Sequence, residues 1–147
     1  KSNAVDVMLD ITKRINKEIY NANPFFVYLQ PTSPLRNSKH INEAFNLLNK
    51  YKKNSLVSLT LSKETPFKTF TLDKKNNLKS VFSEKMTNHN RQDLPNTYKA
   101  NGAIYIFKLS NFLKNKSFPS NGSIPFIMNE IQSLDIDSIA DIRKAKK

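Results

Sequence analysis

Residues 25–36 read FFVYLQPTSPLR. The continuous apolar run Phe25–Leu29 is typical of a short strand buried in a sheet. Pro31 and Pro34 prevent a helix or a regular strand from continuing, so the strand must end in a shaped loop. This stretch therefore predicts a buried strand followed by a loop, which is where open α/β sheets place their ligands.

The sequence around this strand predicts further elements of one α/β domain. Apolar residues recur every three or four positions over 4–19, with Ser2 or Asn3 as the N-cap. A helix capped by Ser38 leads to a second apolar run, and such a strand–helix–strand unit implies a right-handed crossover and a parallel sheet. The expected elements are helices over 4–19, 38–50, 109–113 and 138–147, and strands over 25–29, 55–61, 102–107 and 125–128.

Residues 66–98 have a different pattern. Apolar and polar residues alternate over 67–72 and again over 78–82, on either side of the polar turn 73–77. This pattern predicts a β-hairpin. We therefore expect a single domain over 1–147 that carries 66–98 as an inserted hairpin.

The chain is strongly basic. It has 24 Lys and Arg residues against 12 Asp and Glu residues, a net charge of +12 and a pI near 9.9. Such a surplus attracts anions. The basic residues are mostly dispersed lysines, whereas readers of nucleic-acid grooves cluster Arg and Lys on one face. Charge alone favours solvated surface lysines, with an enzyme for small anionic substrates or a nucleic-acid binder as alternatives.

The composition also excludes several kinds of site. The absence of Cys rules out disulfides and thiolate metal sites, and two distant His residues form no metal-binding motif. Two glycines cannot build a glycine-rich phosphate loop within these residues. No apolar run approaches the ~18 to 20 residues of a membrane span, and no signal-peptide pattern is present. We expect a cytoplasmic protein with no membrane partner.

Two segments carry polar side chains suited to anionic ligands. Gln30 offers an amide, and Arg36 offers a guanidinium fork for carboxylate or phosphate. Asp135 and Asp137 alternate along an extended segment, so their carboxylates point to one side and suit Mg²⁺ completed by substrate phosphates. The alternative is that Asp137 caps the helix that starts at Ser138.

Residues 91–105 are dense in side chains that form hydrogen bonds. Arg91 could bind a carboxylate. Asn101 and Gly102 permit a tight backbone at the start of a strand. Tyr105 could pack against a ligand or belong to the core.

Read in order, these pieces closely resemble the CMP-N-acylneuraminate synthetases, the sialic acid cytidylyltransferases and their relatives that act on legionaminic acid. The resemblance covers nearly the whole chain. It implies an α/β fold with a three-layer, Rossmann-like nucleotide-diphosphosugar-transferase sheet and an inserted dimerisation hairpin, without the family's N-terminal strands. The matching segments are LQPTSPLR at 29–36, RQ at 91–92 with Pro95 and Tyr98, NGAIY at 101–105 and DID at 135–137.

The resemblance also implies a reaction and a site. CMP would pass from CTP to the anomeric hydroxyl of a nine-carbon 2-keto sugar acid, N-acetylneuraminic acid or a close relative, in a homodimer with shared active sites and no nucleic acid. Asp135 and Asp137 would bind Mg²⁺ and, with Arg91, form the catalytic set. Lys68 and Arg91 would reach the acid's carboxylate, often in the partner's site, and Tyr105 and Phe118 would flank its acyl group. The substrate-binding residues are then Gln30, Arg36, Lys68, Arg91, Asn101, Tyr105 and Phe118.

The sequence departs from this family at two places. The family's first strand and its basic loop, of the form Ala-Arg-x-Gly-Ser-Lys, have no counterpart here. We therefore expect a fragment that lacks the CTP-phosphate loop and is inactive alone, and a basic α/β module that binds nucleic acid or protein is the alternative function. Positions 145–146 read Ala-Lys where the family usually has Ala-Glu, a minor variation.

Overall fold

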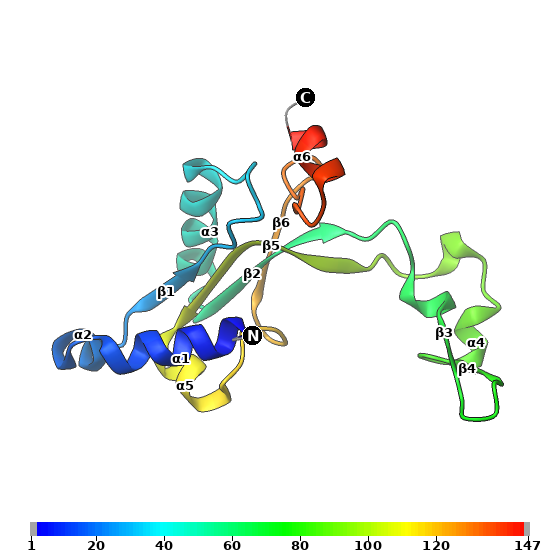
Figure 1. Ribbon diagram of the computed structural model, residues 1–147, viewed down its shortest axis with the longest axis horizontal. Coiled ribbons are helices and arrows are strands. Elements are labelled where there is room, and N and C mark those ends of the chain that lie inside the picture. Colours follow the sequence, from blue (N-terminus) through cyan, green and yellow to red (C-terminus); the bar gives the residue numbers. More distant parts are fainter. Residues whose placement is uncertain (1–2, 146–147) are drawn as a thin grey trace. The chain divides into compact units, whose positions relative to one another are not determined.

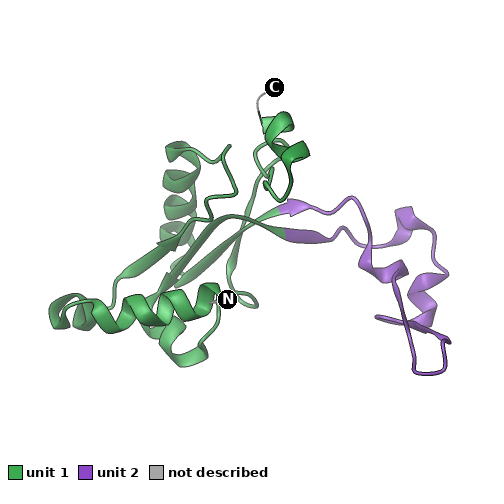
Figure 2. Ribbon diagram, viewed as in Figure 1, with its two compact units in different colours: residues 1–59, 100–147 green, residues 60–99 purple. Residues whose placement is uncertain are grey.

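The computed structural model describes residues 3–145 and divides into two compact units (Figure 2). Lys1–Leu59 and Ala100–Lys147 form the first, here called the sheet unit. Thr60–Lys99 form the second, here called the hairpin unit. The expected domain with an inserted 66–98 hairpin stays a prediction, because compactness alone does not define domain boundaries.

The sheet unit is built on a four-stranded sheet in the order β1-β5-β2-β6 (Figure 1). Strands β2 and β5 continue into the hairpin unit. The elements are α1 (Ala4–Arg14), α2 (Lys17–Ala22), β1 (Phe25–Tyr28), α3 (Ser38–Tyr51), β2 (Ser55–Leu61), β5 (Tyr98–Lys108), α5 (Leu109–Asn115), β6 (Ile124–Ile127) and α6 (Ile139–Ala145). The expected closing helix over 138–147 extends past the described residues, and so does Lys146.

The sheet is mixed, so the expectation of a parallel sheet is wrong in part. β5 lies between β1 and β2 and runs antiparallel to β1, with Tyr28 opposite Tyr105. β2 and β6 are parallel, with Leu56 opposite Ile124. A short apolar run is equally suited to either direction, so the pattern could not reveal that β5 separates the first two strands.

The first expected helix is two helices. Asn3 caps α1 by accepting a hydrogen bond from the Asp6 N–H at 2.9 Å, and Ser2 lies outside the described residues. Ile15 is extended, and Asn16 then caps α2 by accepting from the Ile19 N–H at 2.8 Å. An asparagine cap restarts the helix because its side chain satisfies an amide that the interrupted helix leaves free.

The second helix, α3, begins one residue away from its expected cap. Asn37, not Ser38, is the N-cap, and its side-chain oxygen accepts from the His40 N–H at 3.1 Å. The His40 ring accepts in return from the Asn37 N–H at 3.2 Å. Two reciprocal bonds fix the point where the loop after β1 becomes helix.

Helices cover both faces of the sheet, so the expected three-layer α/β class is confirmed (Figure 1). On one face α3 packs Ala44 and Leu48 against the strands. On the other face Met8 of α1 and Phe112 of α5 pack around Phe107. No described helix is long and apolar enough to cross a membrane.

The hairpin unit has short elements. They are η1 (Pro66–Lys68), β3 (Phe70–Leu72), β4 (Leu78–Ser80), α4 (Glu84–Thr87) and η2 (Arg91–Asp93). β3 and β4 pair antiparallel, as the alternation predicts, although Pro66 begins a 3₁₀ turn that shortens the expected first strand. In the turn, the Asp73 carboxylate accepts from the backbone N–H groups of Asn77 and Lys75, and these bonds lower the pKa of Asp73.

Candidate active site

Gln30 and Gly102 form one contact at the end of β1. Gly102 has φ of +74°, a conformation that favours glycine. A Cβ atom at Gly102 would collide with the side-chain oxygen of Gln30. The glycine therefore allows the Gln30 amide to lie directly over the β5 backbone.

Arg36 closes the loop that starts at Gln30. Its Nη1 donates to the backbone oxygens of Gln30 at 3.1 Å and Ala103 at 2.9 Å. Burial lowers the pKa of Arg36 from its ordinary value, although an arginine stays charged in proteins. One nitrogen of the guanidinium thus ties the loop to β5, and its expected contact with substrate stays a prediction.

The side chain of Asn101 is buried at 4% exposure and fully hydrogen-bonded. Its Oδ1 accepts from the Ser58 hydroxyl at 2.6 Å and from the Ala103 N–H at 3.2 Å. Its Nδ2 donates to the Ser133 Oγ at 2.8 Å and to the Met128 Sδ at 3.4 Å. These bonds give Asn101 a structural role, and its expected contact with substrate stays a prediction.

Asp135 lies in a segment joined to the Gln30 loop. The Ile136 N–H donates to the Thr32 oxygen at 2.8 Å. The Oδ1 atom of Asp135 is buried without a hydrogen-bond partner. A buried carboxylate oxygen without a donor suits a bound cation. Asp137, on the same segment, is exposed.

Two carboxylates would supply only part of a metal shell. Within residues 3–145 no group of three or more His, Cys, Asp or Glu side chains is placed to hold a metal ion. Mg²⁺ ordinarily keeps several waters and takes substrate phosphates with one or two carboxylates. The residues present therefore fit a cation that arrives with a phosphate-bearing substrate.

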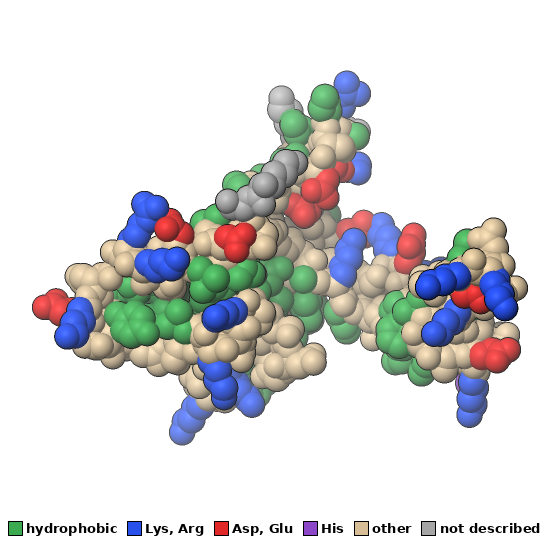
Figure 3. All heavy atoms as spheres, turned by 60° about the horizontal axis from the view of Figure 1, so that its bottom comes forward, with side chains coloured by type: hydrophobic (Ala, Val, Ile, Leu, Met, Phe, Trp, Pro, Cys, Tyr) green, Lys and Arg blue, Asp and Glu red, His purple; other side chains and the backbone are tan. Residues whose placement is uncertain are grey.

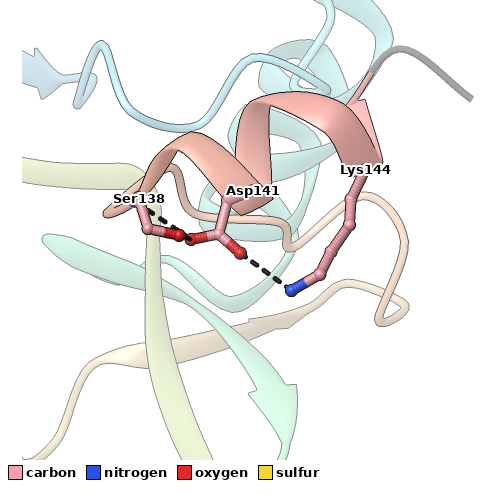
Figure 4. Close-up of polar contacts among 3 residues, drawn as sticks. All are labelled: Ser138, Asp141 and Lys144. Atoms are coloured by element: carbon pink, nitrogen blue, oxygen red, sulfur yellow. Dashed lines mark hydrogen bonds and ion pairs between the residues drawn. The ribbon is translucent and has the colours of Figure 1, made fainter.

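Ser138, Asp141 and Lys144 are bonded to one another at the start of α6 (Figure 4). The Ser138 hydroxyl and its N–H both donate to the Asp141 carboxylate, at 2.6 and 3.1 Å, and Lys144 reaches the other oxygen at 2.8 Å. Lys144 and Ser138 lower the pKa of Asp141 to about 2. The structure therefore gives no capping bond to Asp137, the alternative role considered for it.

Tyr105 and Phe118 belong to an aromatic cluster. The Phe118 ring centroid lies 4.7 Å from that of Tyr28 and 5.4 Å from that of Tyr105. Burial, followed by the charges of Tyr28 and Asp135, raises the pKa of Tyr105. Tyr105 and Phe118 line an apolar cavity of about 460 Å³, which also touches Val57.

Lys68 and Arg91 belong to the hairpin unit. Both side chains are exposed. The Arg91 guanidinium donates to the backbone oxygen of Lys63. The predicted site residues thus fall in two units, and the sheet unit holds Gln30, Arg36, Asn101, Tyr105, Phe118, Asp135 and Asp137.

Sequence reasoning missed two hydroxyls beside this site, those of Ser58 and Ser133. Ser58 is 0% exposed, and Ser133 accepts from Asn101. Ser58 left a readable signal, because it is a polar residue in the middle of the apolar strand SLVSLTL. Ser133 lies in a polar loop, where a hydroxyl gives no such contrast.

Basic side chains do not gather at one place on the face drawn in Figure 3. Lys and Arg are spread over both units there, and hydrophobic side chains also reach the surface. The whole chain carries a net charge of +12. The drawn face therefore carries a diffuse positive charge rather than a basic stripe.

The fold is that of a known class. A solved structure titled 4-diphosphocytidyl-2C-methyl-D-erythritolsynthase, from Anaerococcus prevotii, matches with a TM-score of 0.60 at 12% identity. The match covers 97% of this chain and 64% of that one. At this identity the likeness concerns the fold alone, and it supports the Rossmann-like α/β class.

The relatives found by sequence indicate a narrower class of protein than the fold does. The chain is 37% identical over 123 residues to the N-acylneuraminate cytidylyltransferase of Streptococcus agalactiae serotype III, and 38% identical over 130 residues to that of Escherichia coli O18:K1:H7. It is also 34% identical over 116 residues to the CMP-N,N'-diacetyllegionaminic acid synthase of Legionella pneumophila. The resemblance to CMP-N-acylneuraminate synthetases is thus confirmed. No protein-family model matches the chain.

These relatives are longer than the chain. The alignments cover 83%, 86% and 77% of this chain, but 29%, 30% and 48% of the three relatives. The chain therefore spans less than half of each of them, and similarity to a segment does not by itself assign the activity of the whole.

Proposed function

We propose that the chain carries the sugar-acid and metal-binding part of a cytidylyltransferase that makes a CMP-sugar. The substrates are CTP and a nine-carbon 2-keto sugar acid of the N-acetylneuraminic or legionaminic type. The products are the CMP-sugar and pyrophosphate. The relatives' names support this class of reaction for the segment they share.

One observation carries this proposal. The Gln30 loop and the Asp135 segment come from distant parts of the sequence, and the hydrogen bond from Ile136 to Thr32 joins them at 2.8 Å. The first segment offers an amide for a sugar acid. The second offers a buried carboxylate oxygen without a hydrogen-bond partner. This pairing suits a reaction that brings a sugar acid to a metal-bound phosphate.

The chemistry assigned to these residues is positioning and charge neutralisation. The anomeric oxygen of the acid forms a bond to the α-phosphorus of CTP, the bond from that phosphorus to the bridging oxygen breaks, and its electrons leave with pyrophosphate. The hydroxyl proton passes to water. Asp135 and Asp137 would hold the divalent cation, Mg²⁺, whose charge offsets that of the triphosphate. Gln30 orients the acid, and Tyr105 with Phe118 packs against its acyl group.

We also propose a homodimer in which Lys68 and Arg91 act in the site of the partner subunit. The hairpin unit supports this because it exposes apolar side chains, with Leu72 at 63%, Leu78 at 70% and Phe82 at 57%. A small hairpin cannot bury such groups by itself. A second copy related by a two-fold axis supplies a matching surface.

The reaction is tested by pyrophosphate release from the full-length protein. We expect release with CTP, Mg²⁺ and either N-acetylneuraminate or N,N'-diacetyllegionaminate, and much less with ATP in place of CTP. Removal of the metal with a chelator should abolish release. No pyrophosphate release with either acid, together with salt-dependent binding of RNA or duplex DNA, would favour the basic binding module instead.

The shared site is tested by mixing two inactive proteins. Arg91→Ala removes a carboxylate fork, and Asp135→Asn removes a metal ligand. Subunit exchange between these variants should restore about a quarter of wild-type activity, because half of the dimers are then mixed and each has one intact site. No recovery, although exchange is demonstrated, would mean that Arg91 serves its own subunit.

A further inference from the structure

The Asn101 side chain lies where several segments of the sheet unit meet. It contacts β2 through Ser58, at 2.6 Å. It contacts the turn after β6 through Ser133, at 2.8 Å. Its backbone oxygen accepts from the Ser33 hydroxyl of the Gln30 loop, at 3.4 Å. These bonds connect residues that are 43, 32 and 68 positions away in the sequence.

The Asn101 amide has no hydrogen-bonding capacity left. A carboxamide offers two acceptor lone pairs and two N–H donors. Ser58 and the Ala103 N–H occupy the acceptor, and Ser133 and the Met128 sulfur occupy the donors. A substrate could bond to this amide only by displacing one of these partners, and the residue is only 4% exposed.

Ser58 extends the network into the sheet. Its hydroxyl donates to Asn101 and accepts from the Ile104 N–H at 2.7 Å. The residue is 0% exposed. A completely satisfied buried polar group of this kind fixes one arrangement, because any shift leaves a donor or acceptor unpaired.

The hydrogen-bond network of Asn101 is attached to the Asp135 segment at Ser133, on the N-terminal side of Asp135. Ser133 is bonded to Asn101, and Ile136 is bonded to Thr32 at 2.8 Å. Asp135 lies between these two anchored residues. Its Oδ1 gains no hydrogen bond of its own, so the position of the carboxylate depends on the anchored backbone on both sides.

We infer that Asn101 is a positioning residue, which fixes the Asp135 segment and the Gln30 loop on the sheet instead of binding substrate. The inference rests on the proposed function for its catalytic consequence. Its structural part, the anchoring of residues 133–136, concerns the protein without substrate.

The test compares three serine substitutions in the full-length protein. Ser133→Ala removes one bond to Asn101 at a half-buried site, so it should fold even where Asn101→Ala fails to fold. Ser133→Thr keeps the hydroxyl and should behave as wild type. Ser55→Ala is the matched control, because the Ser55 hydroxyl of β2 also pairs with a distant serine, Ser123 just before β6, at 2.9 Å, but takes no part in the network.

We expect Ser133→Ala to raise the Mg²⁺ concentration for half-maximal rate about tenfold, as loss of a residue that supports a metal ligand typically does. The KM for the sugar acid should stay within about twofold. Ser133→Thr and Ser55→Ala should change neither value. An unchanged Mg²⁺ requirement in Ser133→Ala, or a tenfold higher acid KM in Asn101→Asp with an unchanged Mg²⁺ requirement, would overturn the inference.

Amide hydrogen exchange without substrate separates this inference from the proposed function. Exchange of the Ile136 N–H should be faster in Ser133→Ala than in wild type, and unchanged in Ser55→Ala. If the protein lacks cytidylyl transfer but shows this difference, the proposed function fails and the anchoring stands. If exchange is identical in all variants, the anchoring is wrong whatever the activity.

Discussion

The sheet unit and the hairpin unit are stabilised in different ways. In the sheet unit even polar groups are buried and paired, with Ser58 at 0% and Asn101 at 4% exposure. The buried hydrophobic residues of the described chain all belong to it. Both units expose some large hydrophobic side chains, such as Ile139 at 74% and Leu78 at 70%, but the hairpin unit has none of these buried hydrophobic residues.

The two units therefore differ in how far their own contacts stabilise them. The sheet unit can hold the Gln30 loop and the Asp135 segment by its own contacts, because it contains the buried core and the hydrogen bonds of Asn101 and Thr32. Strands of three residues each give the hairpin unit little stability of its own. The proposed dimer would give this unit a further surface against which to pack.

The largest effect should come from the Asp135 carboxylate in the sheet unit. Asp135→Asn keeps the shape but removes the negative charge that would bind the cation. We expect turnover to fall by about a hundredfold or more, measured as pyrophosphate release. Without metal the melting temperature should not fall, since the buried Oδ1 atom of Asp135 has no hydrogen-bond partner to lose.

Asp10→Asn is the control for this substitution. Asp10 is exposed on α1 and pairs with Arg14, at 2.7 Å. Such surface pairs contribute about 1 kcal/mol or less, so activity should be unchanged. Equal loss of activity in both variants would show that general charge, and not the site, is responsible.

The next effect should appear in the hairpin unit as a change of assembly. Leu78→Asp places a charge on its apolar surface. If this surface is the dimer interface, the dimer dissociation constant should rise about tenfold or more, because burying a leucine contributes about 1.5–3 kcal/mol. Sedimentation equilibrium measures this change. Ile139→Asp in the sheet unit, at 74% exposure, should leave assembly unaltered.

A smaller effect should follow from the contact between Gly102 and Gln30. Gly102→Ala would push the Gln30 amide aside, and the KM for the sugar acid should rise about tenfold through loss of a substrate hydrogen bond. Gly122→Ala carries the same backbone strain, with φ of +80°, but meets no atom within 4 Å. Both variants should lose about 1–2 kcal/mol of stability through the strained backbone. Gly102→Ala should lose more because of the collision, and only this variant should lose affinity.

The smallest effect should be seen at α6. The pKa of Asp141 is lowered to about 2, so its bonds to Ser138 and Lys144 persist while the carboxylate is charged. Their contribution is complete above the unfolded pKa of about 4 and is lost as the pH falls through about 2. A carboxyl NMR titration should give this low value. Ser138→Ala should bring the pKa of Asp141 nearer to 4. An unshifted pKa in wild type would contradict the bonds of Asp141 to Ser138 and Lys144.

Local patterns were enough to predict most elements of this protein and the family that it resembles. The apolar run 55–61 is the strand Ser55–Leu61, since the apolar residues and the polar residues that flank them are encoded within the segment itself. The two prolines end β1 before the Gln30 loop for the same local reason. The motifs at 29–36, 101–105 and 135–137 were sufficient for the family resemblance, which needs no knowledge of contacts.

Only the tertiary structure decided which elements are neighbours. It also decided which polar groups form hydrogen bonds between those elements. β5 separates β1 from β2, and Asn101 uses its whole amide on Ser58, Ala103, Ser133 and Met128. The sequence offered Asn101 as a substrate contact because an amide has the same donors and acceptors wherever it lies. Whether those groups face a ligand or the protein depends on segments tens of residues away, and that proximity exists only once the chain has folded.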